Sequence, residues 1–299
     1  MKEKIGTICI ILAGVLWGTM GIFVRGLSAV NLSSMEIVTL RSFVALLFML
    51  VIILVKKPSY LRIRLKDVWC FVGTGVVSLT FFNYCYFTTI RETSMAVAAI
   101  LLYTSPVFIV LFSAILFKEP ITRRKVIAMA IALIGCGMVT GILNNSQSAL
   151  SVKGLLIGLG AGVGYALYSI FGRYAINKGY NSLTITFYTL FFATIATCCI
   201  ESVPSIISKV TTGNVGMNCL YSIGIALAVT VIPYLLYTKG LESVDNGKAG
   251  IMASIEPIVA AVLGGVIFSE RITFSGIVGI ALVVGAIVLL NIKCSKDRK

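Results

Sequence analysis

The sequence contains no histidine among its 299 residues. This absence excludes metal sites with imidazole ligands, Ser-His nucleophile pairs and histidine proton relays, on which many hydrolases and metalloenzymes depend. The sequence also lacks a Walker motif and a nucleotide-binding domain, so we expect no use of ATP by this chain. Charged residues make up only 12% of the chain. We therefore expect a protein that is not an enzyme and that needs neither a cofactor nor a metal.

Apolar residues, in contrast, are abundant. They make up 58% of the chain, and the mean hydropathy is +1.02, a value that soluble domains rarely reach. A helix that crosses a bilayer needs about 20 apolar residues and satisfies its backbone hydrogen bonds internally. Ten runs meet this requirement and predict an all-α polytopic membrane protein. The predicted spans are residues 5–24, 35–55, 68–87, 95–117, 126–143, 154–172, 183–203, 218–237, 249–268 and 274–292.

The positive charge lies in the short loops between these spans. The chain has 25 Lys and Arg residues against 11 Asp and Glu residues. Since cytoplasmic loops retain Lys and Arg, the side that carries 19 of the 25 is expected to face the cytoplasm, together with both termini. The charge therefore indicates topology and contact with the lipid bilayer rather than nucleic-acid binding. We expect a multi-pass protein of the plasma membrane, and the sequence gives no indication of its oligomeric state.

The two halves of the chain repeat one sequence plan. Ser105-Pro106 returns 151 residues later as Glu256-Pro257, and each surrounding run ends in Phe-x-Glu-x-Ile-Thr, at residues 117–122 and 268–273. Each half holds five predicted spans, an odd number, so the second copy should lie inverted in the membrane relative to the first. We predict two inverted five-helix repeats, residues 1–146 and 147–299, that work by alternating access around a central cavity.

Glycines recur at short spacing within two of these runs. Gly158, Gly160, Gly162 and Gly164 lie inside a predicted span rather than between a strand and a helix, which argues against a phosphate-binding loop. Gly14 and Gly18 have a similar spacing in the first span. Small residues at such positions let helices approach closely, and we predict helix packing there.

Several of these features together resemble the drug/metabolite transporter superfamily, and in particular EamA-type permeases, over essentially the whole chain. The resemblance depends on Leu16-Trp17-Gly18, on Arg41 to Ala45, and on the proline-containing span with its Phe-x-Glu-x-Ile-Thr ending in each half. It implies a transporter of small polar metabolites, often an exporter of amino acids or related compounds, with a central cavity between the halves. The alternative is a membrane-embedded enzyme or accessory subunit that acts on a lipid-linked substrate.

Two charged residues lie deepest in the predicted spans. Glu256 and Arg41 lie roughly 9 to 10 Å into their helices at ~1.5 Å per residue, where a charge costs roughly 2.5 to 3.5 kcal/mol on insertion. We predict that Glu256 contacts a cationic substrate group or exchanges a proton, unless it is a neutral, hydrogen-bonded structural residue. Arg41 is predicted to meet a substrate carboxylate, or else to pair with Glu256 or extend to the interface. Glu36, near a helix end, is expected to be a solvated carboxylate.

Polar aromatic side chains complete the predicted site. A buried Tyr hydroxyl or Trp N–H needs a partner, and such residues often line a cavity. Tyr237, at a predicted helix end, is expected to be an interfacial anchor instead. The prolines that interrupt the two matching spans, Pro106 and Pro257, are the predicted hinges. The predicted substrate-binding residues are Trp17, Arg41, Asn83, Tyr86, Tyr103, Tyr165, Tyr168 and Glu256.

Overall fold

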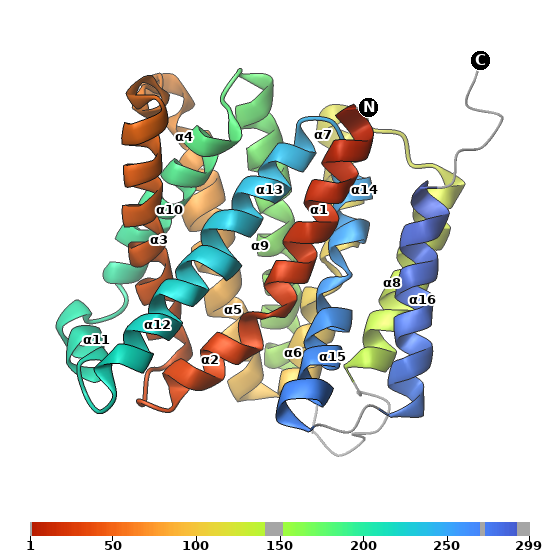
Figure 1. Ribbon diagram of the computed structural model, residues 1–299. Helices are drawn as coiled ribbons and strands as arrows, with labels where there is room; N and C mark the ends of the chain where they lie inside the picture. The colour runs from red at the N-terminus through yellow and green to blue at the C-terminus, as the bar shows by residue number, and fades with distance from the viewer. Residues whose placement is uncertain (1, 141–151, 270–272, 292–299) are drawn as a thin grey trace.

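The computed structural model describes residues 2–140, 152–269 and 273–291, and these residues form helices and turns without a strand (Figure 1). Eight helical segments of this part are long and apolar enough to cross a membrane. Helices α10 and α11, which meet at a bend of 97°, would make a ninth span if counted as one. The predicted repeat boundary between residues 146 and 147 lies outside the described residues, as does Glu270 of the second Phe-x-Glu-x-Ile-Thr sequence.

Several of the spans are composed of two shorter helices. Two of them also contain a π-helical stretch, Gly73–Thr80 between α4 and α5 and Leu227–Val231 between α12 and α13. The helices are α1 (Lys2–Gly18), α2 (Met20–Ser28), α3 (Ser34–Lys56), α4 (Val68–Val72), α5 (Phe81–Glu92), α6 (Met95–Leu102), α7 (Ser105–Phe117), α8 (Arg123–Val139), α9 (Val152–Asn177), α10 (Ser182–Cys198), α11 (Val203–Val210), α12 (Val215–Ala226), α13 (Ile232–Leu241), α14 (Asn246–Ala253), α15 (Glu256–Phe268) and α16 (Phe274–Asn291).

Proline explains two of these interruptions. A proline ring collides with the carbonyl four residues earlier and provides no N–H to it. Helix α6 ends at Leu102, four residues before Pro106, and α14 ends at Ala253, four residues before Pro257. Each proline then lies in the first turn of the following helix, where its missing N–H costs nothing. The predicted breaks in these two spans are therefore present at matching positions of the two halves.

One predicted span is shorter than expected. The run at residues 183–203 was expected to continue as one helix, but α10 ends at Cys198 and the chain turns through 97° into α11. Pro204 lies in the first turn of α11 and cannot continue the preceding helix. Helix α11 therefore lies across the end of the bundle (Figure 1).

The helices pack mainly against helices of the other half. Helix α1 packs on α13, α5 on α9, α3 on α10, α7 on α14, and α8 on α16. The pairs α1 with α13 and α9 with α5 each join the first predicted span of one half to the third predicted span of the other half. Helices α8 and α16 form one edge of the bundle (Figure 1).

Glycines permit the closest of these contacts, which confirms the packing role predicted for them. A Cβ atom on Gly14 would lie 2.6 Å from Ile255 Cγ2, and one on Gly162 would lie 2.8 Å from the Leu101 carbonyl oxygen. A Cβ on Gly18 would lie 2.6 Å from Val259 Cβ and 2.8 Å from the Glu256 carbonyl oxygen. Because such distances are too short for real contacts, α1 can approach α14 and α15 this closely only without these side chains.

Replacing Gly18 by alanine is expected to destabilise the protein by about 1 to 3 kcal/mol, the usual cost of overpacking a tight contact. The midpoint of thermal unfolding in detergent measures the effect. Gly21 provides a matched control on the adjacent helix, because no other atom lies within 4 Å of a Cβ built there. Equal losses for Gly18→Ala and Gly21→Ala would show that the close approach of α1 to α15 does not limit stability.

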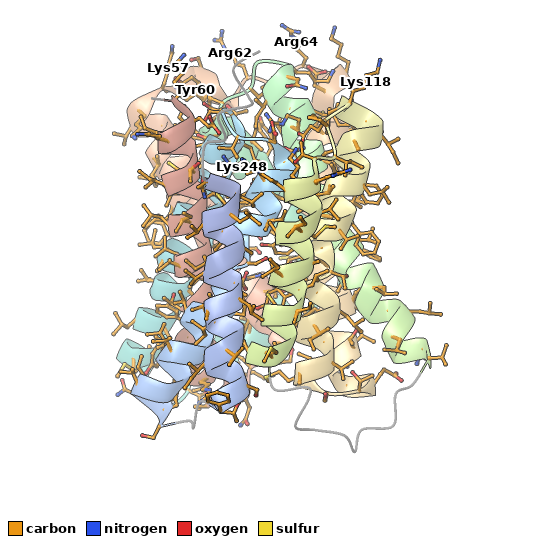
Figure 2. The ribbon with its side chains drawn as sticks, turned by 90° about the vertical axis from the view of Figure 1, so that its right-hand side faces the viewer. Lys57, Tyr60, Arg62, Arg64, Lys118 and Lys248 are labelled. Atoms are coloured by element: carbon orange, nitrogen blue, oxygen red, sulfur yellow. The ribbon has the colours of Figure 1, made fainter. Side chains whose placement is uncertain are left out.

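The two ends of the bundle differ in charge. Figure 2 shows Lys57, Arg62, Arg64, Lys118 and Lys248 at one end, which we call the basic end. Helix α1 begins at this end, whereas the loop from α2 to α3 and the crossing helix α11 lie at the opposite end (Figure 1). The distribution agrees with the charge asymmetry read from the sequence.

Candidate functional site

An aromatic cluster lies at the centre of the bundle. The ring centroid of Trp17 lies 6.2 Å from that of Tyr165, 5.5 Å from that of Tyr234 and 5.4 Å from that of Tyr237. Tyr168 packs edge-on against Tyr234 with a centroid separation of 5.1 Å. Edge-to-face contacts of this kind stabilise ring packing beyond the burial of area alone. Helices α1, α9 and α13 thus meet through five aromatic rings.

Two tyrosine hydroxyl groups of this cluster form hydrogen bonds with other side chains. Tyr168 Oη and Thr238 Oγ1 are 2.7 Å apart, and Tyr237 Oη lies 2.8 Å from Ser169 Oγ. The expectation that Tyr237 anchors the protein at the interface was wrong, since its side chain is only 1% exposed. Helix α13 continues to Leu241 and packs against α1, so position 237 faces the interior of the bundle.

Arg41 is a buried cation that forms no ion pair with a carboxylate of the described residues. Its side chain is 3% exposed, and it donates a hydrogen bond to Asn83 Oδ1 at 3.2 Å and a weak one to Met20 Sδ at 3.9 Å. Asn83 in turn donates to the Leu79 carbonyl at 2.7 Å, which orients its amide oxygen toward Arg41. In the part of the chain that the structure describes, no ion pair of Arg41 is found, and Arg41 does not extend to the interface. Several of its five donors remain available to a ligand.

Glu256 is the first residue of α15 and follows the break after α14. It lines a hollow of about 10 Å³ with Tyr103, Tyr165 and Ser254. Residues 2–140, 152–269 and 273–291 provide neither a hydrogen bond nor an ion pair to its carboxylate. The alternative of a hydrogen-bonded structural glutamate therefore has no partner in the described structure. Arg41 and Glu256 are near enough to interact electrostatically, although they are too far apart to form an ion pair.

A cavity of about 600 Å³ opens at the end of the bundle opposite the basic end. It reaches the exposed residues Gly21, Arg25 and Met95 at its mouth, and Tyr86, Tyr103 and Pro257 at its inner end. Helices α2, α6 and α15 surround it, and Figure 1 shows them at this end of the bundle. Volumes of this size hold metabolites and drug-sized ligands. We call it the open cavity.

Three small hollows adjoin the open cavity, either directly or through one another. The hollow at Glu256 shares Tyr103 with the open cavity and Tyr165 with a hollow of about 20 Å³ inside the aromatic cluster. The hollow at Arg41 and Asn83, also about 20 Å³, shares Val24 with the open cavity. Each small hollow has room for a single water molecule at most. All eight residues predicted from the sequence line one of these four neighbouring spaces, and both predicted hinge prolines border them as well.

A polar network joins the two halves at the basic end. The Glu119 carboxylate accepts hydrogen bonds from the backbone N–H groups of Asn246 at 3.1 Å and of Gly247 at 3.3 Å, at the start of α14. Lys125 Nζ lies 3.1 Å from an Asp245 carboxylate oxygen, and Arg173 Nε donates to Asn246 Oδ1 at 2.9 Å. We call these contacts the α14 network. Sequence reasoning missed it, although Glu119 belongs to the Phe-x-Glu-x-Ile-Thr sequence that marks each repeat.

The expectation of a solvated Glu36 was wrong. Its side chain is 5% exposed and lies 2.7 and 2.8 Å from Lys209 Nζ. Ser205 also donates to it at 3.2 Å, and with Ser33 it forms a reciprocal cap of α3. The bend after α10 brings α11 back over the start of α3, which places Lys209 beside this carboxylate. The ends of α3 and α11 are therefore fastened together on the side where the cavity opens.

The comparison with known proteins identifies the family of this chain. Residues 4–141 and 152–292 each match the EamA-like transporter family, so the chain belongs to that family. It is a multi-pass membrane transporter, as the resemblance predicted. The family match places one copy of the same sequence pattern in each half of the chain.

Several relatives are also named as transporters. An uncharacterized transporter of Archaeoglobus fulgidus is 28% identical over 290 residues, which cover 96% of each chain. The threonine/homoserine exporter RhtA of Salmonella typhimurium is 27% identical over 242 residues, which cover 79% of this chain and 76% of the exporter. A solved crystal structure superposes with a TM-score of 0.81 at 19% sequence identity and covers 98% of this chain and 99% of its own. That likeness shows a shared fold.

Proposed function

We propose that the protein is a secondary transporter of the plasma membrane that exports small zwitterionic metabolites, such as amino acids, by alternating access. The observation that carries the proposal is a cavity of about 600 Å³ that adjoins the small hollows lined by Arg41 and by Glu256. These two side chains carry opposite charges in the interior, and neither has an ion-pair partner among the described residues. Buried charges are retained in membrane proteins mainly where they bind substrate or ions.

A zwitterion would satisfy both groups at once. The Arg41 guanidinium can accept a substrate carboxylate through its planar fork of donors, and Glu256 can accept the hydrogen bonds of a substrate ammonium group. Tyr103 and Tyr165 lie beside Glu256, where their rings can contact the ammonium group or the substrate side chain. Binding would therefore replace two uncompensated charges by two paired ones.

The structural match between the halves supports two inverted repeats of five spans each. This count takes α8 and the bent pair α10–α11 as spans in addition to the eight long segments. Each half carries a π-helical stretch, a proline break and a helix that ends in a left-handed residue, Lys118 in one half and Ser269 in the other, both at φ 56°. The excess of Lys and Arg at the basic end favours a cytoplasmic location for that end and for both termini.

With that orientation, the described conformation is open to the exterior and closed to the cytoplasm by the α14 network. Transport would require this network to separate while the open cavity closes around the substrate. The breaks at Pro106 and Pro257 lie beside the site and are the natural hinges for this motion. An electrochemical gradient or the substrate gradient itself would drive the flux.

Reconstitution into liposomes tests the proposal. Proteoliposomes that contain the purified protein are loaded with a panel of amino acids, amines, carboxylic acids and nucleosides, and release is followed by mass spectrometry. Saturable release of zwitterions, and little release of compounds that lack either charge, is expected. Chemical conversion of a lipid-linked substrate would indicate the alternative, a membrane enzyme or its accessory subunit. Release of nucleosides or amines alone would contradict the assignment of the site to zwitterions.

A further inference from the structure

A second hollow lies at the basic end, away from the open cavity. It has a volume of about 280 Å³ and is enclosed by the loop that follows α3 and the turn between α9 and α10. Figure 2 shows Tyr60, Arg62 and Arg64 of this loop at the basic end. Its lining includes Tyr60, Arg62, Arg64, Lys178, Tyr180 and Thr184. We call it the basic hollow.

Hydrogen bonds fix the walls of the basic hollow. Tyr180 Oη accepts from the Arg64 backbone N–H at 3.0 Å and donates to the Asp67 carboxylate at 2.9 Å. Thr184 Oγ1 donates to the Tyr60 carbonyl at 2.9 Å, and Tyr188 Oη donates to the Leu61 carbonyl at 2.6 Å. The loop after α3 is thereby held against α9 and α10, so the hollow is formed before any ligand binds.

The described residues balance only part of the charge of the basic hollow. Arg62 and Arg64 are exposed, and within the described ranges no carboxylate forms an ion pair with either of them. Lys178 Nζ is 2.6 Å from the buried Asp67 carboxylate, and this hydrogen bond raises the pKa of Lys178 above its ordinary value. Lys178 therefore stays charged at neutral pH, while its charge is offset by Asp67. Two arginines remain to meet an anion, and guanidinium groups suit the oxygens of a phosphate.

Exposed apolar side chains lie near these arginines along the chain. Leu65, next to Arg64 in the chain, is 91% exposed, Val55 is 80% exposed and Trp69 is 44% exposed. Exposed side chains of this kind belong in the hydrocarbon or in the headgroup zone, where tryptophan is enriched. Trp69 also lies close to the hollow, since Lys178 Nζ, which lines it, is 5.8 Å from the centroid of the Trp69 ring. Exposed apolar side chains that could contact acyl chains are therefore found beside the basic hollow.

We propose that the basic hollow binds the headgroup of an anionic phospholipid, with the phosphate between Arg62 and Arg64 and the acyl chains along Leu65 and Trp69. A free phosphate would bind the arginines but would not contact the neighbouring apolar side chains, whereas a phospholipid would contact both. The lipid would join the loop after α3, in the first half of the chain, to the turn between α9 and α10, in the second half. The inference depends only on the membrane location of the protein and not on its substrate.

The affinity of the purified full-length protein for phosphatidylglycerol tests the proposal. Native mass spectrometry of the protein in neutral detergent counts bound lipid during titration with phosphatidylglycerol, phosphatidylcholine or inorganic phosphate. Preferential binding of phosphatidylglycerol is expected. The double substitution Arg62→Gln/Arg64→Gln should weaken it about 100-fold, because it removes charge-assisted hydrogen bonds to the phosphate that contribute roughly a tenfold factor each.

Two further variants separate the hollow from general surface charge. Lys56→Gln/Lys66→Gln removes the same charge from the same stretch outside the lining of the hollow, and it should bind the lipid nearly as well as the unmodified chain. Arg62→Lys/Arg64→Lys keeps the charge but loses the planar fork of donors, so its affinity should lie between those of the unmodified chain and the Gln variant. Equal losses in the two Gln variants would indicate diffuse attraction and overturn the proposal. Inorganic phosphate that binds as tightly as the lipid would overturn it as well.

Discussion

Glu256→Gln is expected to reduce the transport of zwitterionic substrates roughly 10- to 100-fold, because a hydrogen bond to a charged group contributes about 1.5 to 3 kcal/mol. The substitution keeps the shape of the side chain and removes its charge, so the substrate ammonium group loses its counter-charge in a site of low polarity. Initial rates in proteoliposomes as a function of substrate concentration measure the effect. The loss should appear mainly as weaker binding of the zwitterion.

Two comparisons make this prediction specific. Glu242→Gln removes a carboxylate that pairs with Lys239 at the basic end, outside the open cavity, and should leave transport close to that of the unmodified protein. A substrate analogue that lacks the ammonium group should be less sensitive to Glu256→Gln than the zwitterion is. If rate and affinity for the zwitterion are unchanged by Glu256→Gln, the proposed contact does not exist.

In the proposed site, Arg41 holds the carboxylate end of the substrate, and its loss should be at least as damaging. Arg41→Gln should abolish recognition of the substrate carboxylate, whereas Arg41→Lys keeps the charge but loses the planar fork and should retain partial activity. An analogue without the carboxylate should be the compound least affected. The two sets of analogues therefore distinguish which end of the substrate each side chain holds.

Glu119→Gln is expected to open the basic end. The Glu119 carboxylate accepts two backbone N–H groups at the start of α14, and its negative charge also interacts favourably with the positive end of that helix. A neutral amide would accept these hydrogen bonds more weakly, so the population of states in which α14 separates from the α7–α8 loop should rise by about tenfold or more, equivalent to roughly 1.4 kcal/mol. In the proposed cycle, the substitution shifts the equilibrium between the conformations that open to each side of the membrane. Glu119 lies outside the proposed substrate site, so substrate contacts should be unchanged.

Cysteine accessibility measures this shift. Ser113 is buried on α7, and Glu119 N–H donates a hydrogen bond to its carbonyl, so position 113 lies next to the α14 network. Ser113→Cys, in a background without the native cysteines, should react slowly with a polar maleimide and about tenfold faster when combined with Glu119→Gln. Glu92→Gln, which removes a partner of Lys153 in a separate ion pair, is the matched control. Equal reaction rates with and without Glu119→Gln would exclude a gating role for this carboxylate.

The sequence predicted the structure best for features that depend on a single segment of the chain. Apolar runs of about 20 residues located the helical segments, because the solvent for each is the bilayer. The breaks before Ser105 and Glu256 were predicted because proline acts on the carbonyl four residues earlier in its own chain. Arg41 and Glu256 could be selected because a charge inside an apolar run is itself a signal, whatever surrounds it.

Partners of side chains required the tertiary structure. The sequence left Arg41 with several possible partners, and only the packing of α3 against α5 placed it beside Asn83, 42 residues away. Glu36 was expected to face water, but the turn after α10 brought Lys209 beside it from 173 residues away. The α14 network and the burial of Tyr237 likewise depend on how helices of the two halves are rotated against one another. The hydropathy of each segment determines whether that segment enters the membrane. Which side chains face one another depends on the relative rotation and depth of two helices, and no single segment determines these.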